Sequence, residues 1–232
     1  MTPGIIKNHL SDFLSYLANQ CQKGVETLPS LSALSKQLGM SVSTLREELQ
    51  VARAMGLVEV KPRVGIKCQP YSFKPVVSKS LAFAISTDKQ HFRQYSDLRN
   101  HIEASYWYQA VSSLTSEDRE ELNEIIQRAE LKLKSDPLQV PHDEHRQLHL
   151  TIYHRLDNLF VKGILEAYWD IYEAVGLSVF EDQKYLERVW GYHQQMVDSI
   201  INNDFLAGYQ ALIAHMDLLF QRDLENSKVR FE

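Results

Sequence analysis

Residues 31–60 read LSALSKQLGMSVSTLREELQVARAMGLVEV, and this stretch decides the fold of the first third of the chain. Apolar residues recur three and four apart over 32–38, which predicts a short helix that Gly39 can end. Ser41 can then cap a second helix over 42–55. Two helices joined by such a tight turn are typical of a helix-turn-helix.

The flanking sequence extends this pair into a winged helix-turn-helix. An amphipathic helix is predicted over 5–22, where apolar residues again recur three and four apart. After the helix pair, residues 57–60 alternate as a strand, and a returning strand follows over 66–68. Three helices followed by a β-hairpin predict a winged helix-turn-helix domain over residues 1–68.

This fold predicts DNA binding through the N-terminal end of the second paired helix and through the hairpin, or wing. The candidate contacts are Ser43, Thr44, Arg46, Lys61, Arg63 and Gly65. The Arg46 side chain can reach a guanine edge or a phosphate. Helix-turn-helix packing also occurs in proteins that bind no DNA. The uneven distribution of charge favours DNA binding by the first domain. Residues 1–78 hold nine Lys and Arg against five Asp and Glu, whereas residues 79–232 hold 16 against 25.

Composition excludes several other classes of protein. Hydrophobic content of 44% and charged content of 24% are ordinary for a soluble globular chain of 232 residues. No apolar run approaches the roughly 20 residues that span a bilayer, and the N-terminus lacks the layout of a signal peptide. Cys21 and Cys68 make no disulfide framework, so we expect reduced thiols, a cytoplasmic location and no membrane partner.

The remainder of the chain is predicted to be a helical bundle. Residues 69–78 carry two prolines and no helical period, which predicts an extended linker. Beyond it we expect an all-α domain over 79–232, so that the whole chain is mainly α. Its helices are expected over 79–84, 90–112, 116–134, 142–156, 158–177, 183–202 and 205–226.

Four histidines fall on three of these predicted helices. His145 and His149 are four apart and share one helix face, whereas His193 and His215 lie on the last two helices. Three helices of a bundle can aim four imidazoles at one point, and four ligands are usual for a structural transition metal. Spacing alone is weak evidence, because some of nine histidines in 232 residues will fall four apart by chance.

The first domain resembles the DNA-binding domain of the GntR family of bacterial transcription regulators. The matching residues are Leu28-Pro29-Ser30, Leu34, Leu38-Gly39, Ser41, Thr44-Leu45-Arg46-Glu47, Leu49, Gly56-Leu57-Val58 and Gly65. The family usually has Glu-Arg where this chain has Leu31 and Ser32, and Arg where it has Val42. Two arginines that contact DNA in the family are therefore missing, and Arg46 becomes the main expected base contact.

The second domain resembles the FCD ligand-binding domain of the FadR subfamily of GntR regulators. The matching residues are Arg99, Glu103, Leu148-His149, Asn158, His193 and His215. The resemblance implies a divalent metal and a small organic acid effector, with Arg99 and Asn158 as effector-binding residues. Metal-binding members have Asp where this chain has His145. Four neutral imidazoles leave a divalent ion at +2 instead of +1, which favours zinc or nickel over harder ions.

These observations predict a homodimeric bacterial transcription regulator that binds a double-stranded DNA operator and responds to a metal and a carboxylate. Three alternatives stay open. The helical domain could only dimerise, without metal or effector; Arg99 could form a structural ion pair with Glu103; and His145 could be unliganded. A metal-dependent enzyme with Glu103 as base is disfavoured, because a winged helix serves no purpose in a simple hydrolase.

Overall fold

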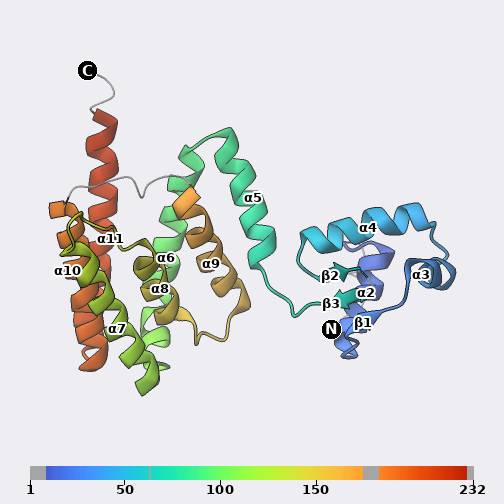
Figure 1. The fold of residues 1–232 in the computed structure, drawn as a ribbon, viewed down its shortest axis with the longest axis horizontal. Helices are drawn as coiled ribbons and strands as arrows, with labels where there is room; N and C mark the ends of the chain where they lie inside the picture. Colours follow the sequence, from blue (N-terminus) through green and yellow to red (C-terminus); the bar gives the residue numbers. More distant parts are fainter. Residues whose placement is uncertain (1–8, 63, 175–182, 229–232) are drawn as a thin grey trace. The chain divides into compact units, whose positions relative to one another are not determined.

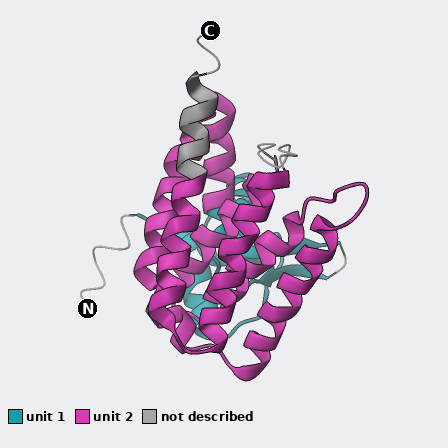
Figure 2. Cartoon of the chain, turned by 90° about the vertical axis from the view of Figure 1, so that its left-hand side faces the viewer, with its two compact units in different colours: residues 1–76 teal, residues 77–232 magenta. Residues whose placement is uncertain are grey.

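The chain folds into two compact units, residues 1–76 and 77–232 (Figure 2). The computed structural model describes residues 9–62, 64–174 and 183–228, without the side chains of 173, 174 and 219–228. No helix in the described part of the chain is long and apolar enough to cross a membrane.

The first unit is a winged helix-turn-helix, as predicted (Figure 1). Its elements are α2 (Asp12–Gln22), β1 (Thr27–Leu28), α3 (Leu31–Leu38), α4 (Val42–Ala54), β2 (Val58–Lys61) and β3 (Gly65–Cys68). The strands form an antiparallel sheet in the order β1-β3-β2. Phe13, Leu34 and Leu45 are fully buried in the core that joins α2, α3 and α4.

The caps expected from the sequence fix the turn between α3 and α4. The Ser41 hydroxyl accepts a hydrogen bond from the Thr44 amide at 3.1 Å, which satisfies a free amide at the start of α4. Gly39 ends α3 with φ at 67°, a left-handed conformation that glycine adopts without a steric penalty. The turn therefore follows from the local chemistry of these two residues.

Two features of the first unit differ from the sequence prediction. The helix expected over 5–22 begins only at Asp12, because Ser11 caps it by accepting from the Leu14 amide at 3.2 Å; residues 1–8 lie outside the described part. Strand β1 was not predicted, since two residues carry no periodic pattern. It pairs with β3, placing Leu28 opposite Ile66, and turns the expected hairpin into a three-stranded sheet.

The extended linker predicted over 69–78 is wrong for its second half. Helix α5 (Lys74–Thr87) begins inside it, and the boundary between the units falls within this helix. Pro75 is tolerated because it lies in the first turn, where a backbone N–H has no partner in the helix. The two prolines favour an extended linker over 69–78, but Pro75 stands at the start of a helix.

The second unit is the predicted all-α bundle (Figure 1). After α5 it contains α6 (Gln90–Ser112), α7 (Ser116–Leu133), α8 (His142–Tyr153), α9 (Leu159–Ala174), α10 (Gln183–Ile201) and α11 (Phe205–Lys228). Helix α6 packs on α8, α9 and α11, while α10 packs most extensively on α11 and also on α7. The last residues of the helix expected over 158–177 lie outside the described part.

The close packing of α11 on α6 gives a stability prediction. A Cβ at Gly208 would lie 2.7 Å from Cζ2 of Trp107, a fully buried ring whose Nε1 also donates to the Phe205 carbonyl at 2.9 Å. Gly208→Ala should therefore lower the free energy of unfolding by about 1–3 kcal/mol, despite the better helix propensity of alanine. Urea unfolding measures this change.

Gly191→Ala is the matched control, because nothing lies within 4 Å of a Cβ at that helical glycine. It should raise the free energy of unfolding by up to about 1 kcal/mol. Equal effects of the two substitutions would show that the contact between Gly208 and Trp107 does not limit the packing of α11.

Candidate metal centre and nucleic-acid interface

The four histidines singled out in the sequence meet inside the bundle. Helix α8 supplies His145 and His149, α10 supplies His193, and α11 supplies His215. One ring nitrogen from each lies within 4.8 Å of those of the other three, and none of the four side chains is more than 8% exposed. Three helices thus deliver four potential metal ligands to one buried point.

Six nitrogens of these rings are buried without a hydrogen-bond partner. They are Nε2 of His145, Nε2 of His149, and both ring nitrogens of His193 and of His215. Buried polar groups in native proteins are almost always paired, and leaving one unpaired costs roughly 1–3 kcal/mol. So many unpaired nitrogens facing one another indicate that a partner from outside the protein belongs there.

Burial also keeps the rings in the form that binds metals. Desolvation is the main cause that lowers the pKa of all four histidines well below the ordinary value of 6.5, and the charge of Arg99 lowers each of them further. Neutral imidazoles keep a lone pair for coordination.

A buried ion pair stands behind His149. Its Nδ1 lies 2.9 Å from Nη2 of Arg99 and 3.1 Å from Oε2 of Glu103, while Nε of Arg99 donates to Oε1 of Glu103 at 2.8 Å. Burial is the largest single influence and lowers the pKa of the Arg99 guanidinium, but the attraction and hydrogen bond of Glu103, together with Tyr168 and Tyr153, outweigh it and raise that pKa above its usual value. A carboxylate behind a histidine is a common way to orient a metal ligand.

The contact between Glu103 and His149 was not predicted from the sequence. From the sequence, Glu103 lies one turn from Arg99 on a helix and is a candidate ion-pair partner or base. The spacing of four residues on α6 puts both side chains on one face, and that was the only available signal.

Aromatic side chains close the site. The Trp169 ring lies 4.7 Å from the His145 ring and 5.1 Å from the His149 ring, and the Trp190 ring lies 4.7 Å from that of His193. The guanidinium of Arg99 lies 5.2 Å from the centre of the Trp169 ring. These rings separate the histidines from solvent, which strengthens every electrostatic interaction among them.

The donor set fits a transition metal. Ligand nitrogens around one ion lie no more than about 4 Å apart, so the four rings need to approach by less than about 1 Å. Imidazole donors suit zinc, nickel and copper better than manganese or magnesium. The described cluster could therefore hold a divalent transition metal through Nε2 of His149 and one nitrogen of each other ring.

The two predicted effector-binding residues are already engaged in the protein. Arg99 is ion-paired with Glu103, the alternative that the sequence left open, and its Nη1 also donates to Asn100 at 3.1 Å. The Asn158 side-chain oxygen accepts from the amides of Phe160 and Val161 and so caps α9, while its amide donates to Tyr106 at 3.2 Å. Asn158 thus has a structural role.

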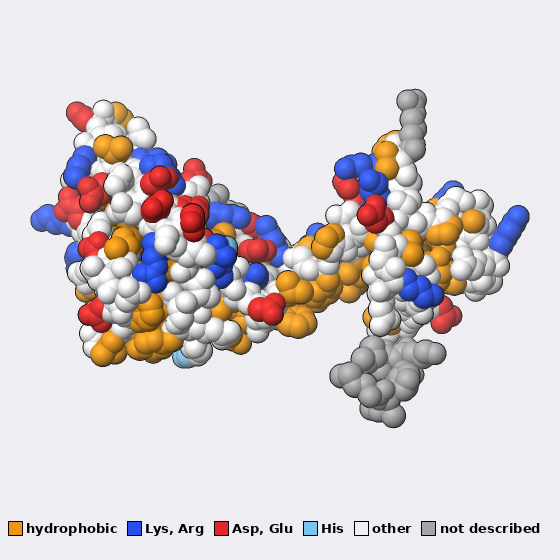
Figure 3. All heavy atoms as spheres, turned by 90° about the horizontal axis from the view of Figure 1, so that it is seen from below, with side chains coloured by type: hydrophobic (Ala, Val, Ile, Leu, Met, Phe, Trp, Pro, Cys, Tyr) orange, Lys and Arg blue, Asp and Glu red, His pale blue; other side chains and the backbone are white. Residues whose placement is uncertain are grey.

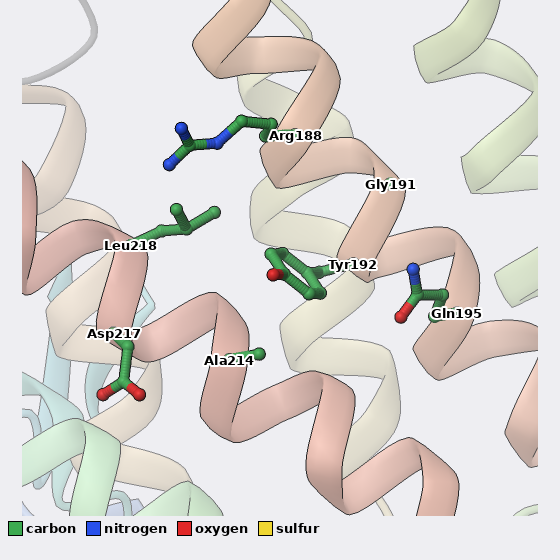
Figure 4. Close-up of a pocket in the computed structure, with 7 residues that line it drawn as sticks. All are labelled: Arg188, Gly191, Tyr192, Gln195, Ala214, Asp217 and Leu218. Atoms are coloured by element: carbon green, nitrogen blue, oxygen red, sulfur yellow. The ribbon is translucent and has the colours of Figure 1, made fainter.

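The bundle also has a surface hollow of about 540 Å³ between α10 and α11. Arg188, Tyr192, Gln195 and Asp217 line it, with their side chains around the gap between the two helices (Figure 4). None of the four clustered histidines lines this hollow, although His193 directly follows Tyr192. The hollow and the histidine cluster are therefore separate features.

The predicted nucleic-acid contacts lie at the start of α4 and on the wing. Ser43, Thr44 and Arg46 are exposed, and Arg46 lines a groove of about 530 Å³ together with Gly65 of the wing. Basic and acidic side chains are mixed on the face that Figure 3 shows. The structure thus brings the N-terminal part of α4 and the wing together along one groove.

Two of the predicted contacts have other partners within the protein. The Thr44 hydroxyl lies 2.8 Å from that of Ser41, and Nζ of Lys61 forms an ion pair with Glu59 at 3.0 Å. Arg63 lies outside the described residues. Arg46 is therefore the main exposed cation described on the predicted surface.

A winged helix-turn-helix followed by an all-α domain is an organisation typical of a transcription regulator. Residues 94–218, more than half of the chain, match the FCD domain family. The chain belongs to the FadR-type GntR transcription regulators, whose helical domain is an FCD domain. It is a regulator and not an enzyme.

Two relatives agree with this assignment, and one solved structure agrees with the fold. The chain is 24% identical to the HTH-type transcriptional regulator LutR of Bacillus subtilis (strain 168), over 82% of this chain and 88% of LutR. It is 25% identical to the Uxu operon transcriptional regulator of Escherichia coli (strain K12), over 88% and 80% of the two chains. The structure of Streptococcus agalactiae GntR has the same fold, with a TM-score of 0.65 at 16% identity, covering 90% of this chain and 96% of that one.

The lowered pKa values predict that the metal-free protein loses stability in mild acid. Below about pH 6.5 the unfolded chain protonates its histidines, whereas the folded chain keeps these four neutral. The free energy of unfolding should fall by up to about 1.4 kcal/mol per pH unit for each histidine as the pH drops. Urea unfolding in EDTA at pH 8, 7 and 6 measures the slope.

His193→Phe should reduce the slope of the free energy of unfolding against pH, because about one proton fewer binds on unfolding. His101→Gln, which changes a largely exposed histidine on α6, is the matched control for the loss of a histidine. A slope that is the same in wild type and His193→Phe would show that the cluster does not control acid stability.

Proposed function

We propose that this GntR-family regulator binds its operator as a homodimer and that its helical domain holds one zinc or nickel ion at His145, His149, His193 and His215. A small organic acid would bind beside the metal with help from Arg99 and modulate operator binding. A role for Asn158 in effector binding stays a prediction. The observation that carries the metal assignment is the set of six buried nitrogens without a partner.

Operator binding is proposed to use Ser43, Thr44 and Arg46 in the major groove, with Lys61, Arg63 and Gly65 of the wing on the backbone or minor groove. The exposure of the first three residues and the groove shared by Arg46 and Gly65 support this assignment. A two-fold dimer follows from the way such domains usually read two half-sites about one helical turn apart.

Metal content tests the first part of the proposal. Elemental mass spectrometry of the purified protein, incubated with zinc or nickel and desalted, should find about one ion per chain. His193→Ala should lose the metal, because neither ring nitrogen of His193 has another partner in the protein. His101→Ala, on the exposed side of α6, should retain it.

The absence of metal in wild type would leave the alternative of a dimerisation domain without a metal. Retention of a full equivalent in His193→Ala would instead place the metal elsewhere in the chain.

Substitution of Arg46 tests the nucleic-acid surface. Arg46→Ala should weaken binding to an operator selected from random-sequence DNA with the wild-type protein by roughly 10- to 100-fold. Arg53→Ala is the matched control, since Arg53 is an exposed arginine at the far end of α4 and donates to Gln50. Fluorescence anisotropy at one fixed salt concentration measures both; equal losses would refute a special role for Arg46.

A further inference from the structure

The two cysteines of the chain lie on two elements of the first unit that share one core. On α2, Phe13 and Leu17 are buried, and Cys21 follows at the same spacing of four, at the end of the same helix face. On β3, Ile66 is buried and Cys68 stands two residues further on, so both side chains point to the same side of the strand. Cys68 packs against the core that these buried residues form.

Backbone contacts hold the two cysteines close together. The Cys21 carbonyl accepts from the Gly24 amide at 3.0 Å, and Gly24 has φ at 73°, so the chain turns directly after α2. The segment that follows runs beside β3, where the Cys68 amide donates to the Glu26 carbonyl at 2.8 Å. The side chains of Cys68 and Cys21 are themselves hydrogen-bonded. A short turn and a strand pair thus bring two thiols together from positions 21 and 68.

The two thiols have different surroundings. Cys21 is exposed at the end of α2, whereas Cys68 is partly buried. Burial, followed by the contact with Cys21, raises the pKa of the Cys68 thiol above its ordinary value to about 11. Because the thiolate is the reactive form and must be reached from solvent, a small oxidant meets Cys21 first, and Cys68 stands beside it as the second thiol.

We propose that Cys21 and Cys68 form a reversible redox pair, which hydrogen peroxide converts into an intramolecular disulfide. The Cys21 sulfur attacks one peroxide oxygen, the O–O bond breaks, and Cys21 becomes a sulfenic acid as the first water leaves. The Cys68 sulfur then attacks the Cys21 sulfur, the S–O bond breaks, and the hydroxyl leaves with the Cys68 proton as the second water. Two thiols are oxidised and one peroxide is reduced to two waters. A dithiol restores both cysteines by exchange.

The disulfide closes a loop around the helix-turn-helix. Residues 22–67 lie between the two cysteines and contain all of α3, α4 and β2. A cross-link around so long a loop removes conformational freedom mainly from the unfolded chain, so it stabilises the folded unit. In a reducing compartment such a bond is transient, and its presence then reports an oxidant. Oxidation therefore stabilises the winged helix-turn-helix, independently of the histidine cluster in the other unit.

Peroxide treatment of the full-length protein tests the pair. At low protein concentration and pH 8, the intact mass of wild type should fall by about 2 Da, and a peptide pair should link Cys21 to Cys68. Dithiothreitol should restore the original mass. Thermolysin should cleave the oxidised protein within residues 22–67 at least about 10-fold more slowly than the reduced protein, because cleavage there needs the unit to unfold.

Cysteine variants separate the two roles. Cys68→Ser should stop at a sulfenic acid on Cys21 that dimedone traps, whereas Cys21→Ser should trap at least about 10-fold less on Cys68. The matched control combines Cys21→Ser with Gln22→Cys, which moves the exposed thiol about 100° around α2. This control should form an internal disulfide at least about 10-fold more slowly than wild type.

An unchanged mass of wild type, disulfide-linked dimers in place of the internal bond, or equal rates in wild type and the Gln22→Cys control would overturn the proposal. None of these outcomes depends on metal content or operator binding, so the proposed function succeeds or fails by its own tests.

Discussion

The structure of the helical domain depends on the burial of four neutral imidazoles at one point. Desolvation keeps His145, His149, His193 and His215 uncharged, and the meeting of their rings from α8, α10 and α11 leaves six of their nitrogens without a partner. This arrangement is costly for a protein alone and favourable with a ligand, because binding free energy becomes stability of the folded domain. Under the proposed function, occupancy of the site would therefore control how firmly the three helices are held together.

The turn between α10 and α11 sets the relative position of two of these histidines, His193 and His215. Asn203 takes a left-handed conformation with φ at 59°, and the Asp204 carboxylate accepts from the Ala207 amide at 3.1 Å to begin α11. This short turn makes α10 and α11 neighbours, and their contact brings His193 and His215 together with ring centres 4.4 Å apart. The local chemistry of this turn therefore brings together two histidines that are 22 residues apart in the sequence.

What could be predicted from the sequence was local. The cap at Ser41 and the helices of the bundle depend on short windows of sequence, and the structure has them as expected. Strand β1 is too short to have a period, and the contact of Glu103 with His149 spans 46 residues. Such contacts depend on how whole helices pack, so they leave no trace in a local pattern. The histidine set is predictable because His145 and His149 share a helix face and because His149, His193 and His215 match the FCD domain.

The DNA-binding unit departs from its family in a way that bears on the proposed regulation. Leu31, Ser32 and Val42 stand where the family has Glu, Arg and Arg, and Glu59 partly offsets the charge of Lys61 on the wing. Fewer cations at each half-site mean weaker binding by one domain. Under the proposed function, operator affinity then depends more on both domains of the dimer engaging at once. A ligand that changes their relative placement would therefore have a large effect here, since a single domain alone holds the operator only weakly.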